Sequence, residues 1–313
     1  MLTGNNIIVK NLYVDFNINN KPLKIIDGID ILFEYGKFTA IIGESGCGKS
    51  VLGQAILNIL PQNAACSGEI LYKKISILNN TKNIDNFYGK EFEVVPQNPE
   101  AAFNPIRKIV KQMDDIFFAA GIKDDNNSDK EELLKLFGMD NTQRVLESYP
   151  HELSGGMQQR VLCAMSVMCK PKWILADEPT KGMDEKLCRV VFNNLSLIKK
   201  ENFSSMIIIT HDISLATEVC DIIAVMYAGQ ILEINNNLIN NPMHPYTKLF
   251  LKALPENGLN VIKGKAPMPG EIIKGCKFAA RCPHCMPVCL NKKPPVYNID
   301  GVMVRCFLYA GRN

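Results

Sequence analysis

A glycine-rich octapeptide near the N-terminus has residue types that can bind the phosphates of a nucleotide. Residues 43–50 read GESGCGKS and fit the phosphate-loop pattern G-x-x-x-x-G-K-[ST]. Glycines let main-chain N–H groups approach phosphate oxygens closely, which a β-carbon would prevent. Lys49 can then reach the β- and γ-phosphates, and the Ser50 hydroxyl can occupy one Mg²⁺ position. The predicted nucleotide-binding residues of this loop are Gly43, Glu44, Ser45, Gly46, Cys47, Gly48, Lys49 and Ser50.

Two adjacent carboxylates follow a short apolar stretch in the second half of the chain. Residues 173–176 read WILA, and Asp177 and Glu178 come directly after them. One carboxylate at the end of a buried strand can hold Mg²⁺ through its water shell, and a second can polarise the attacking water. We therefore expect Asp177 to bind the metal and Glu178 to act as general base. His211 follows the apolar stretch 206–210, and we expect it at the same sheet edge, within reach of a γ-phosphate.

A second pair of glycines lies at the start of a predicted helix. Residues 153–160 read LSGGMQQR, and an apolar helical pattern continues to about Cys169. The hydroxyl of Ser154 can cap the N-terminus of this helix, and Gly155 and Gly156 leave that N-terminus uncovered. Because a bare helix N-terminus attracts anions, this segment predicts a second phosphate-binding site.

Three further residues are weaker candidates for the same site. Gln97 follows a predicted strand at 92–95, from which its amide could reach Mg²⁺ or the attacking water. Tyr13 and Phe16 lie in a predicted strand at 7–16, ahead of the phosphate loop. Either ring could stack on a nucleotide base, and either could instead be an ordinary half-buried strand aromatic.

The elements that position these residues alternate between strands and helices, which is typical of an α/β core. A buried strand at 38–42 precedes the phosphate loop, and a helix from Lys49 to about Leu60 follows it. Residues 101–170 are mostly helical in pattern and are interpreted as an insert in this core. A predicted closing hairpin spans 222–227 and 229–233.

Composition excludes several classes of protein. The chain has 313 residues, 47% of them hydrophobic and 21% charged, with a net charge of +3 and no concentrated basic block that would indicate a nucleic-acid binder. No run reaches the roughly 18 apolar residues that cross a bilayer, and residues 1–10 lack the pattern of a secretory signal. We therefore expect any membrane role to be peripheral, through a partner. The eleven cysteines are expected to be thiols or metal ligands in a reducing compartment.

Taken in order, these motifs resemble those of the ATP-binding subunit of ABC transporters, over about residues 5–235. The motifs are the phosphate loop, Gln97, LSGGMQQR, Ile174–Glu178, Asp184 and His211. The resemblance implies a P-loop ABC ATPase core, with a RecA-like mixed sheet, an antiparallel β subdomain and a helical insert at about 99–170. It also implies a small Cys-rich C-terminal extension.

The resemblance further implies a head-to-tail dimer that holds two ATP molecules. Each ATP would lie between Lys49's loop on one subunit and the Ser154-Gly155-Gly156 segment of the other. Glu178 would be the general base, His211 the γ-phosphate contact and Gln97 the link to the membrane partner. Phe16 is the preferred base-stacking aromatic and Tyr13 the second choice. Asp184 is retained as a nucleotide-site residue, although the loop before it reads KGM rather than the more usual Ser-Ala-Leu.

The end of the chain narrows the resemblance. HPYT at 244–247 resembles the extension of peptide and nickel importer ATPases, as do YPHE at 149–152 and FNP at 103–105. The implied arrangement is a nucleotide-binding domain at 1–235 and an extension at 236–313. The implied partners are two permeases, a homologous second ATPase and an extracytoplasmic binding protein, at the cytoplasmic face of the membrane. The implied cargo is a peptide, nickel or a metal chelate.

An alternative function is that of a soluble ABC ATPase in translation or DNA repair. Such proteins usually carry two ATP cassettes in one chain or a long coiled-coil insert. This sequence has one cassette and no long heptad run, so the transport function is preferred.

Several cysteines cluster near the C-terminus. The spacing of Cys276, Cys282, Cys289 and Cys306 resembles the tails of dipeptide and oligopeptide ATPases, to which an iron–sulfur cluster has been assigned. Four thiolates suit a [4Fe–4S] cluster or zinc equally, and the spacing of Cys282 and Cys285 also favours zinc. Unliganded thiols are the remaining alternative. Within the phosphate loop, Cys47 is expected to react with a maleimide, abolishing hydrolysis unless ATP protects it.

Overall fold

The structure is a computed structural model that describes residues 4–19, 21–78, 87–96, 99–122, 127–254 and 261–311. Its contacts divide the chain into two compact units. Unit 1 comprises Met1–Phe33, Thr39–Asn79 and Cys220–Asn313, and unit 2 comprises Glu34–Phe38 and Asn80–Val219. The phosphate loop and the C-terminal cysteines therefore belong to unit 1, and the helical insert belongs to unit 2.

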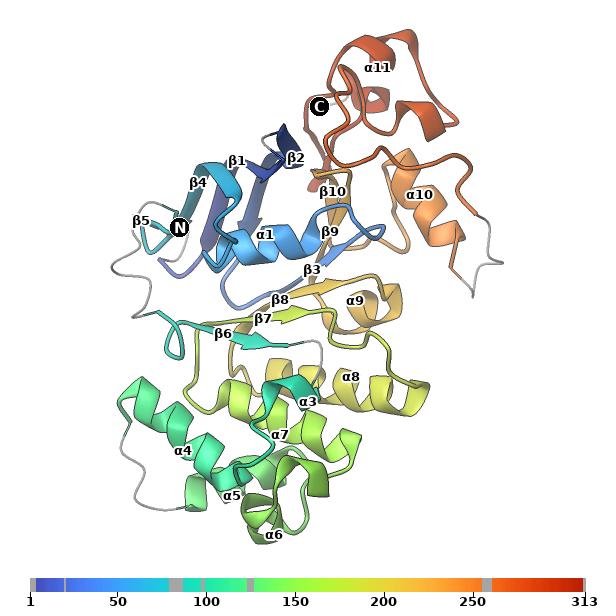
Figure 1. Ribbon diagram of the computed structural model, residues 1–313. Coiled ribbons are helices and arrows are strands. Elements are labelled where there is room, and N and C mark those ends of the chain that lie inside the picture. The colour runs from blue at the N-terminus through green and yellow to red at the C-terminus, as the bar shows by residue number, and fades with distance from the viewer. Residues whose placement is uncertain are drawn as a thin grey trace. The chain divides into compact units, whose positions relative to one another are not determined.

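One sheet of unit 1 is the antiparallel β subdomain (Figure 1). Its strand order is β2 (Lys21–Phe33), β1 (Ile7–Ile18), β4 (Ala64–Tyr72) and β5 (Ile75–Ser76). Along β1 the buried side chains are Ile7, Val9, Leu12 and Val14. This near-alternation is expected of a strand that packs one face on a core, with shifts of register after Val9 and Val14.

A second group of strands in unit 1 leads into the phosphate loop. Strand β3 (Phe38–Ile42) runs parallel to β9 (Ile222–Tyr227), which pairs with β10 (Gln230–Asn235) as the predicted hairpin. Every residue of β3 is buried, as expected for a parallel strand covered on both faces. Helix α1 follows the loop but covers only Lys49–Ile56, so the prediction that it continues to Leu60 was wrong. Asn58 has a φ of 54°, a left-handed conformation that ends the helix.

Unit 2 contains parallel strands and the helical insert. Its strand order is β6 (Phe92–Val95), β7 (Trp173–Asp177) and β8 (Ser205–Thr210). Helix α8 (Glu185–Lys200) connects β7 to β8, and α9 (Ile213–Val219) follows β8. Between β6 and β7 the chain is helical, and these helices lie together (Figure 1). They are α3 (Pro99–Ala102), α4 (Ile109–Ala120), α5 (Ser128–Leu136), α6 (Thr142–Glu147), η1 (Pro150–Glu152) and α7 (Gly155–Val167).

The C-terminal extension packs within unit 1 rather than forming a unit of its own. Its strand β12 (Val302–Val304) pairs with β10 and with β11 (Tyr297–Ile299). The other elements of the extension are α10 (Pro245–Lys252), η3 (Ala279–Arg281), α11 (Pro287–Asn291) and η4 (Phe307–Tyr309). Within the part of the chain that the structure describes, no helix combines the length and apolar character of a membrane span.

Candidate functional site

The phosphate loop lies against β9, where two of its glycines are required by geometry. Gly43 has a φ of 155°, and a β-carbon there would lie 2.1 Å from the carbonyl oxygen of Met226. Gly48 occupies the N-cap of α1 with a φ of 105°, a conformation that L side chains rarely adopt. Ser45 and Gly46 are exposed at the turn of the loop. The loop thus presents main-chain N–H groups and a helix N-terminus to solvent, as an anion site requires.

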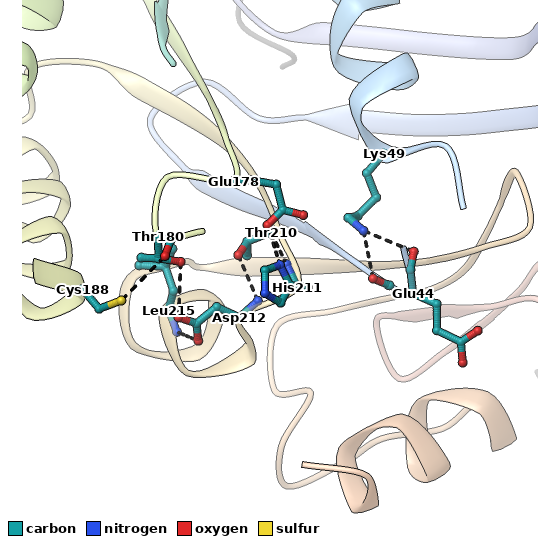
Figure 2. Close-up of polar contacts among 10 residues, drawn as sticks. Glu44, Lys49, Glu178, Thr180, Cys188, Thr210, His211, Asp212 and Leu215 are labelled. Atoms are coloured by element: carbon teal, nitrogen blue, oxygen red, sulfur yellow. Dashed lines mark hydrogen bonds and ion pairs between the residues drawn. The ribbon is translucent and has the colours of Figure 1, made fainter. Parts of the chain in front are cut away.

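Lys49 lies over the loop rather than extending into solvent (Figure 2). Its Nζ donates hydrogen bonds to the carbonyl oxygens of Gly43, at 2.9 Å, and Glu44, at 3.3 Å. The residue is only 6% exposed. A positive charge fixed at this position and shielded from water interacts strongly with a phosphate that enters the loop.

Cys47, inside the phosphate loop, is shielded from solvent. Its side chain is buried, and burial raises its pKa from 9.0 to about 11. Because the thiolate is the nucleophile, this pKa shift slows the reaction of Cys47 with a maleimide, and the loss of hydrolysis and the protection by ATP stay predictions.

We expect alkylation of Cys47 at pH 8 to be about 100-fold slower than that of a thiol with a pKa of 9.0, because each pKa unit changes the thiolate fraction tenfold. The rate should rise about tenfold per pH unit until it levels off near pH 11. Peptide mass spectrometry over pH 7–10 measures this, with exposed Cys285 as the internal comparison. Labelling of Cys47 as fast as that of Cys285 at pH 8 would contradict the burial.

The parallel pairing of β7 and β8 brings the predicted base and histidine together. Asp177 is the last residue of β7, and the N–H of Glu178 donates to the carbonyl oxygen of Ile209 on β8, at 2.7 Å. His211 Nδ1 lies 2.6 Å from Oε2 of Glu178 (Figure 2). In the tautomer that carries its proton on Nδ1, His211 donates this hydrogen bond to the carboxylate. The contact fixes the direction of the carboxylate.

Glu178 also has an unusual backbone conformation. Its φ of 50° lies in the left-handed region, which is uncommon for residues other than glycine. Such strain costs of order 1–3 kcal/mol and is found mostly at functional sites. Glu178 is 14% exposed by its side chain and His211 is 53% exposed, so the pair lies at the surface of unit 2. This arrangement can present an oriented carboxylate to a water molecule.

Two residues that sequence reasoning missed brace the loops behind this pair. The hydroxyl of Thr180 donates to Asp212 Oδ2 at 3.4 Å, and Oδ1 of Asp212 accepts from the N–H of Leu215 at 3.0 Å. The N–H of Asp212 donates to Thr210 Oγ1 at 2.9 Å (Figure 2). These bonds tie the segment after β7 to the segment after β8. Their only sequence signal was a polar residue close after each strand.

The structure confirms that Ser154 caps α7. Its Oγ accepts from the N–H of Met157 at 3.3 Å, and both Ser154 and Gly155 are exposed. A β-carbon on Gly155 or Gly156 would come no closer than 3.9 Å to Leu187, so little covers this helix start. Asp184 likewise caps α8, accepting from the N–H of Leu187 at 2.8 Å. Contact of these residues with a nucleotide stays a prediction.

The structure describes two of the three weaker candidates, Phe16 and Tyr13. Gln97 lies outside the described residues. Phe16 is half-buried on β1, opposite Leu23 and Ala64 in the two neighbouring strands. Tyr13 has Lys24 Nζ 5.6 Å from its ring centre. A cation already over the Tyr13 ring is consistent with Phe16 as the preferred partner of a base, which stays a prediction.

The four predicted cysteine ligands line a single small pocket in the extension, with a cavity volume of about 10 Å³. Cys276, Cys289 and Cys306 are buried and Cys282 is half-buried, whereas Cys285 is exposed and does not line the pocket. Burial raises the pKa of Cys276 and Cys306 to about 11. Among the described residues, no three His, Cys, Asp or Glu side chains are grouped to hold one metal ion.

Comparison with known proteins identifies both parts of the chain. Residues 26–181 match the ABC transporter family, and residues 233–289 match the family described as oligopeptide/dipeptide transporter, C-terminal region. The oligopeptide transport ATP-binding protein AppD of Bacillus subtilis is 33% identical, with 96% of each chain covered. The dipeptide transport ATP-binding protein DppD of the same species is 34% identical, covering 97% of this chain and 95% of that one.

Solved structures agree on the fold. CbiO1 of Clostridium perfringens, part of the ABC transporter complex CbiONQ, is 26% identical with a TM-score of 0.63, covering 80% of this chain and 94% of that one. The dimeric ATP-binding cassette MJ0796 bound to ADP and Pi has a TM-score of 0.62 at 21% identity, covering 74% of this chain and 98% of that one. The full-length relatives favour transport over the alternative of translation or DNA repair. The chain therefore belongs to the ABC transporter ATPases, in the group of oligopeptide and dipeptide transport ATP-binding proteins.

Proposed function

We propose that this ATPase powers the import of peptides through a pair of membrane permeases, from the cytoplasmic face of the membrane. The observation that carries the proposal is similarity over almost the whole chain to peptide-transport ATPases, including the C-terminal region that describes this group. An extracytoplasmic binding protein would deliver the cargo to the permeases. Nickel or a metal chelate is the other cargo class, and the experiment below separates it from peptide.

In the proposed mechanism, the chain's own residues bind and orient the triphosphate. Lys49 would transfer its hydrogen bonds from loop carbonyls to the β- and γ-phosphates. Ser50, Asp177 and Gln97 would hold Mg²⁺, which supplies charge neutralisation for the phosphates when bound. Glu178, oriented by His211 at 2.6 Å, would accept the proton of the attacking water. His211 would then sense the γ-phosphate.

The second half of each ATP site would come from another subunit. The exposed start of α7, with Ser154 and the two glycines after it, has the uncovered N–H groups that would bind a phosphate. A head-to-tail dimer gives it a triphosphate in trans. We propose that the other subunit is a homologous second ATPase rather than a copy of this chain.

A groove on unit 2 suits a permease segment. It has a volume of about 440 Å³ and contains both charged and apolar side chains. Ile106, next to the groove residue Arg107, is 82% exposed and adds an apolar side chain beside the groove. Val94 and Pro96 also line the groove, so it reaches the segment that Gln97 follows. The residues that line the groove include Glu93, Val94, Pro96, Arg107, Asp115 and Leu162.

We also propose that the cysteine pocket holds a [4Fe–4S] cluster, with zinc as the second choice. The donor set fits, because four thiols line one pocket and the exposed Cys285 is left out. A tetrahedral zinc ion, with Zn–S near 2.3 Å, would need its thiolates closely grouped around one point. The described residues contain no group of three or more such ligands, so the choice between cluster and zinc rests on the metal content measured below. The group would supply a covalent staple for a small extension.

Replacing Cys289 with serine should remove the metal from the purified chain. We expect roughly four iron and four sulfide per wild-type chain when it is isolated without oxygen, and almost none in the Cys289→Ser variant. Cys285→Ser is the matched control and should retain the wild-type content. If the wild-type chain contained one zinc ion and no sulfide, zinc would be the bound metal instead of the cluster. A wild-type chain without metal would refute both the cluster and the zinc proposal.

The transport function is tested by isolating the complex. A Glu178→Gln chain, stalled with ATP, would be captured from gently solubilised membranes of its own cell, and the co-purifying proteins identified. Two permeases, a second ATPase and a binding protein are expected, and mass spectrometry of the binding protein's ligand would decide between peptide and metal. Ribosomal or DNA-repair partners without any membrane protein would overturn the proposal.

A further inference from the structure

A charged pair connects the C-terminal extension to the phosphate loop. Arg281 Nη1 donates to Oε2 of Glu44, the second residue of the loop, at 2.9 Å. The side chain of Arg281 is 7% exposed and that of Glu44 is 26% exposed, so water screens this pair less than it screens surface pairs. The same guanidinium nitrogen lies 3.2 Å from the hydroxyl oxygen of Tyr227. Arg281 is thus held on one side by the loop and on another by β9.

Glu44 is also one of the two residues, with Gly43, whose carbonyl oxygens hold Lys49. Its carbonyl oxygen accepts from Lys49 Nζ, and its N–H donates to the hydroxyl oxygen of Tyr246 on α10, at 3.2 Å. In Figure 2 the Glu44 carboxylate points away from Lys49. The extension therefore contacts Glu44 at its side chain through Arg281 and at its main chain through Tyr246. Neither contact competes with the lysine for the same atom.

A second path leads from the same part of the extension to the far end of the loop. Lys277 Nζ donates to the carbonyl oxygen of Ala228 at 2.7 Å and lies 3.0 Å from Asp27 Oδ2. The next residue, Gly229, donates its N–H to the carbonyl oxygen of Cys47 at 2.9 Å. Lys277 thus supports the turn that binds the loop at Cys47.

Both cations lie in a short segment whose ends are pocket cysteines. Lys277 and Arg281 fall between Cys276 and Cys282, and the N–H of Ala279 donates to the carbonyl oxygen of Cys276 at 3.0 Å. Phe278 lines the cysteine pocket, and its ring centre lies 5.4 Å from those of Tyr227 and Tyr246. Each cation therefore follows or precedes a pocket cysteine directly, so a shift of that cysteine reaches the backbone of Arg281, which contacts the loop, or of Lys277, which contacts the turn beside it.

We propose that Arg281 and Lys277 are positioning residues for the phosphate loop, and that they couple nucleotide binding to the packing of the cysteine pocket. Coupling between two sites is reciprocal. Bound nucleotide should therefore favour the closely packed state of the cysteine pocket by the same factor by which that state raises the affinity for nucleotide. The inference uses the phosphate loop as the nucleotide site of this ATPase. It depends neither on the cargo nor on which metal, if any, the pocket holds.

The first test measures MgADP affinity of the purified full-length chain by calorimetry. Arg281→Met should weaken binding by about 5- to 150-fold, the range typical of coupled sites. Arg281→Lys, which keeps the charge, should recover part of the loss. Arg189→Met is the matched control, because it removes an exposed pair with Glu218 of similar length, 2.8 Å, in unit 2. That variant should bind within twofold of wild type.

A double-mutant cycle then asks whether Arg281 acts through Glu44. Combining Arg281→Met with Glu44→Gln should cost little more than either change alone, because both remove the same contact. Fully additive losses would mean that the two side chains act independently and would overturn the proposal. If Arg281→Met fails to fold, Glu44→Gln alone, measured in the same way, must still weaken binding.

The second test reads the reverse direction through cysteine alkylation at pH 9, quantified by peptide mass spectrometry after chelator treatment. In wild type, saturating MgADP should slow labelling of Cys276, Cys282, Cys289 and Cys306 by several-fold. In Arg281→Met that slowing should disappear, whereas Cys47 in the phosphate loop should remain protected at saturation. A merely structural role for Arg281 would speed labelling equally with and without nucleotide. Identical labelling of the pocket cysteines with and without MgADP in wild type would refute the coupling.

Discussion

Replacing Glu178 with glutamine should lower ATP turnover by about 10²- to 10⁴-fold, the range that general-base catalysis contributes. Glutamine has nearly the same shape and can still hydrogen-bond to His211, but it cannot take a proton from water. The affinity for ATP should stay within a few-fold of wild type, because the phosphate loop and Lys49 belong to a different segment and are unchanged. Turnover is measured with the partner subunits present, and affinity by calorimetry.

The control for this experiment is Glu218→Gln in the same unit. Glu218 is exposed and forms an ion pair with Arg189, away from the Glu178–His211 pair, so its loss should leave turnover unchanged. Wild-type-like turnover in Glu178→Gln would show that another group activates the water. A parallel loss of ATP affinity would instead place Glu178 among the binding residues.

The sequence predicted those parts of the site that are encoded by short, contiguous segments. The strand, glycine turn and helix around Gly43–Ser50 are local, and so is the cap that Ser154 provides to α7. The position of Glu178 and His211 at one sheet edge, 33 residues apart, followed from the parallel pairing of neighbouring strands, whereas their hydrogen bond is a finding of the structure. Periodicity and end signals were sufficient for each of these features.

Features that depend on long-range packing could not be read from the sequence. Glu44 and Arg281 are 237 residues apart, and no pattern in either segment indicates their ion pair. The burial of Cys47 follows from the approach of β9 to the loop, which the motif itself does not specify. The end of α1 at Ile56 also escaped prediction, because the apolar pattern continues past the residue that breaks the helix.

Replacing Lys49 with methionine should impair both binding and turnover. In the wild type, the loop already holds the shielded charge of Lys49 in place, so binding phosphate costs little entropy for ordering this side chain. The change to methionine removes that charge and its attraction for phosphate. We expect the affinity for MgATP to fall at least tenfold. Turnover at saturating ATP should fall about 10²- to 10³-fold, the range for loss of one preorganised group that stabilises the transition state.

The control must separate loss of charge from loss of structure, since methionine leaves the Gly43 and Glu44 carbonyls without this donor. An unpaired buried acceptor costs about 1–3 kcal/mol, so the unfolding free energy is measured alongside. The control is Lys10→Met, which removes an exposed lysine 3.9 Å from Glu69. It should change neither the affinity for MgATP nor turnover. A residue that contacts the phosphates of bound ATP should affect both affinity and turnover when it is replaced. If Lys49→Met kept wild-type ATP affinity, as Glu178→Gln is expected to, the assignment of Lys49 as a phosphate-binding residue would be wrong. Loss of both steps in one variant and of turnover alone in the other would divide the site into a part that binds ATP and a part that cleaves it.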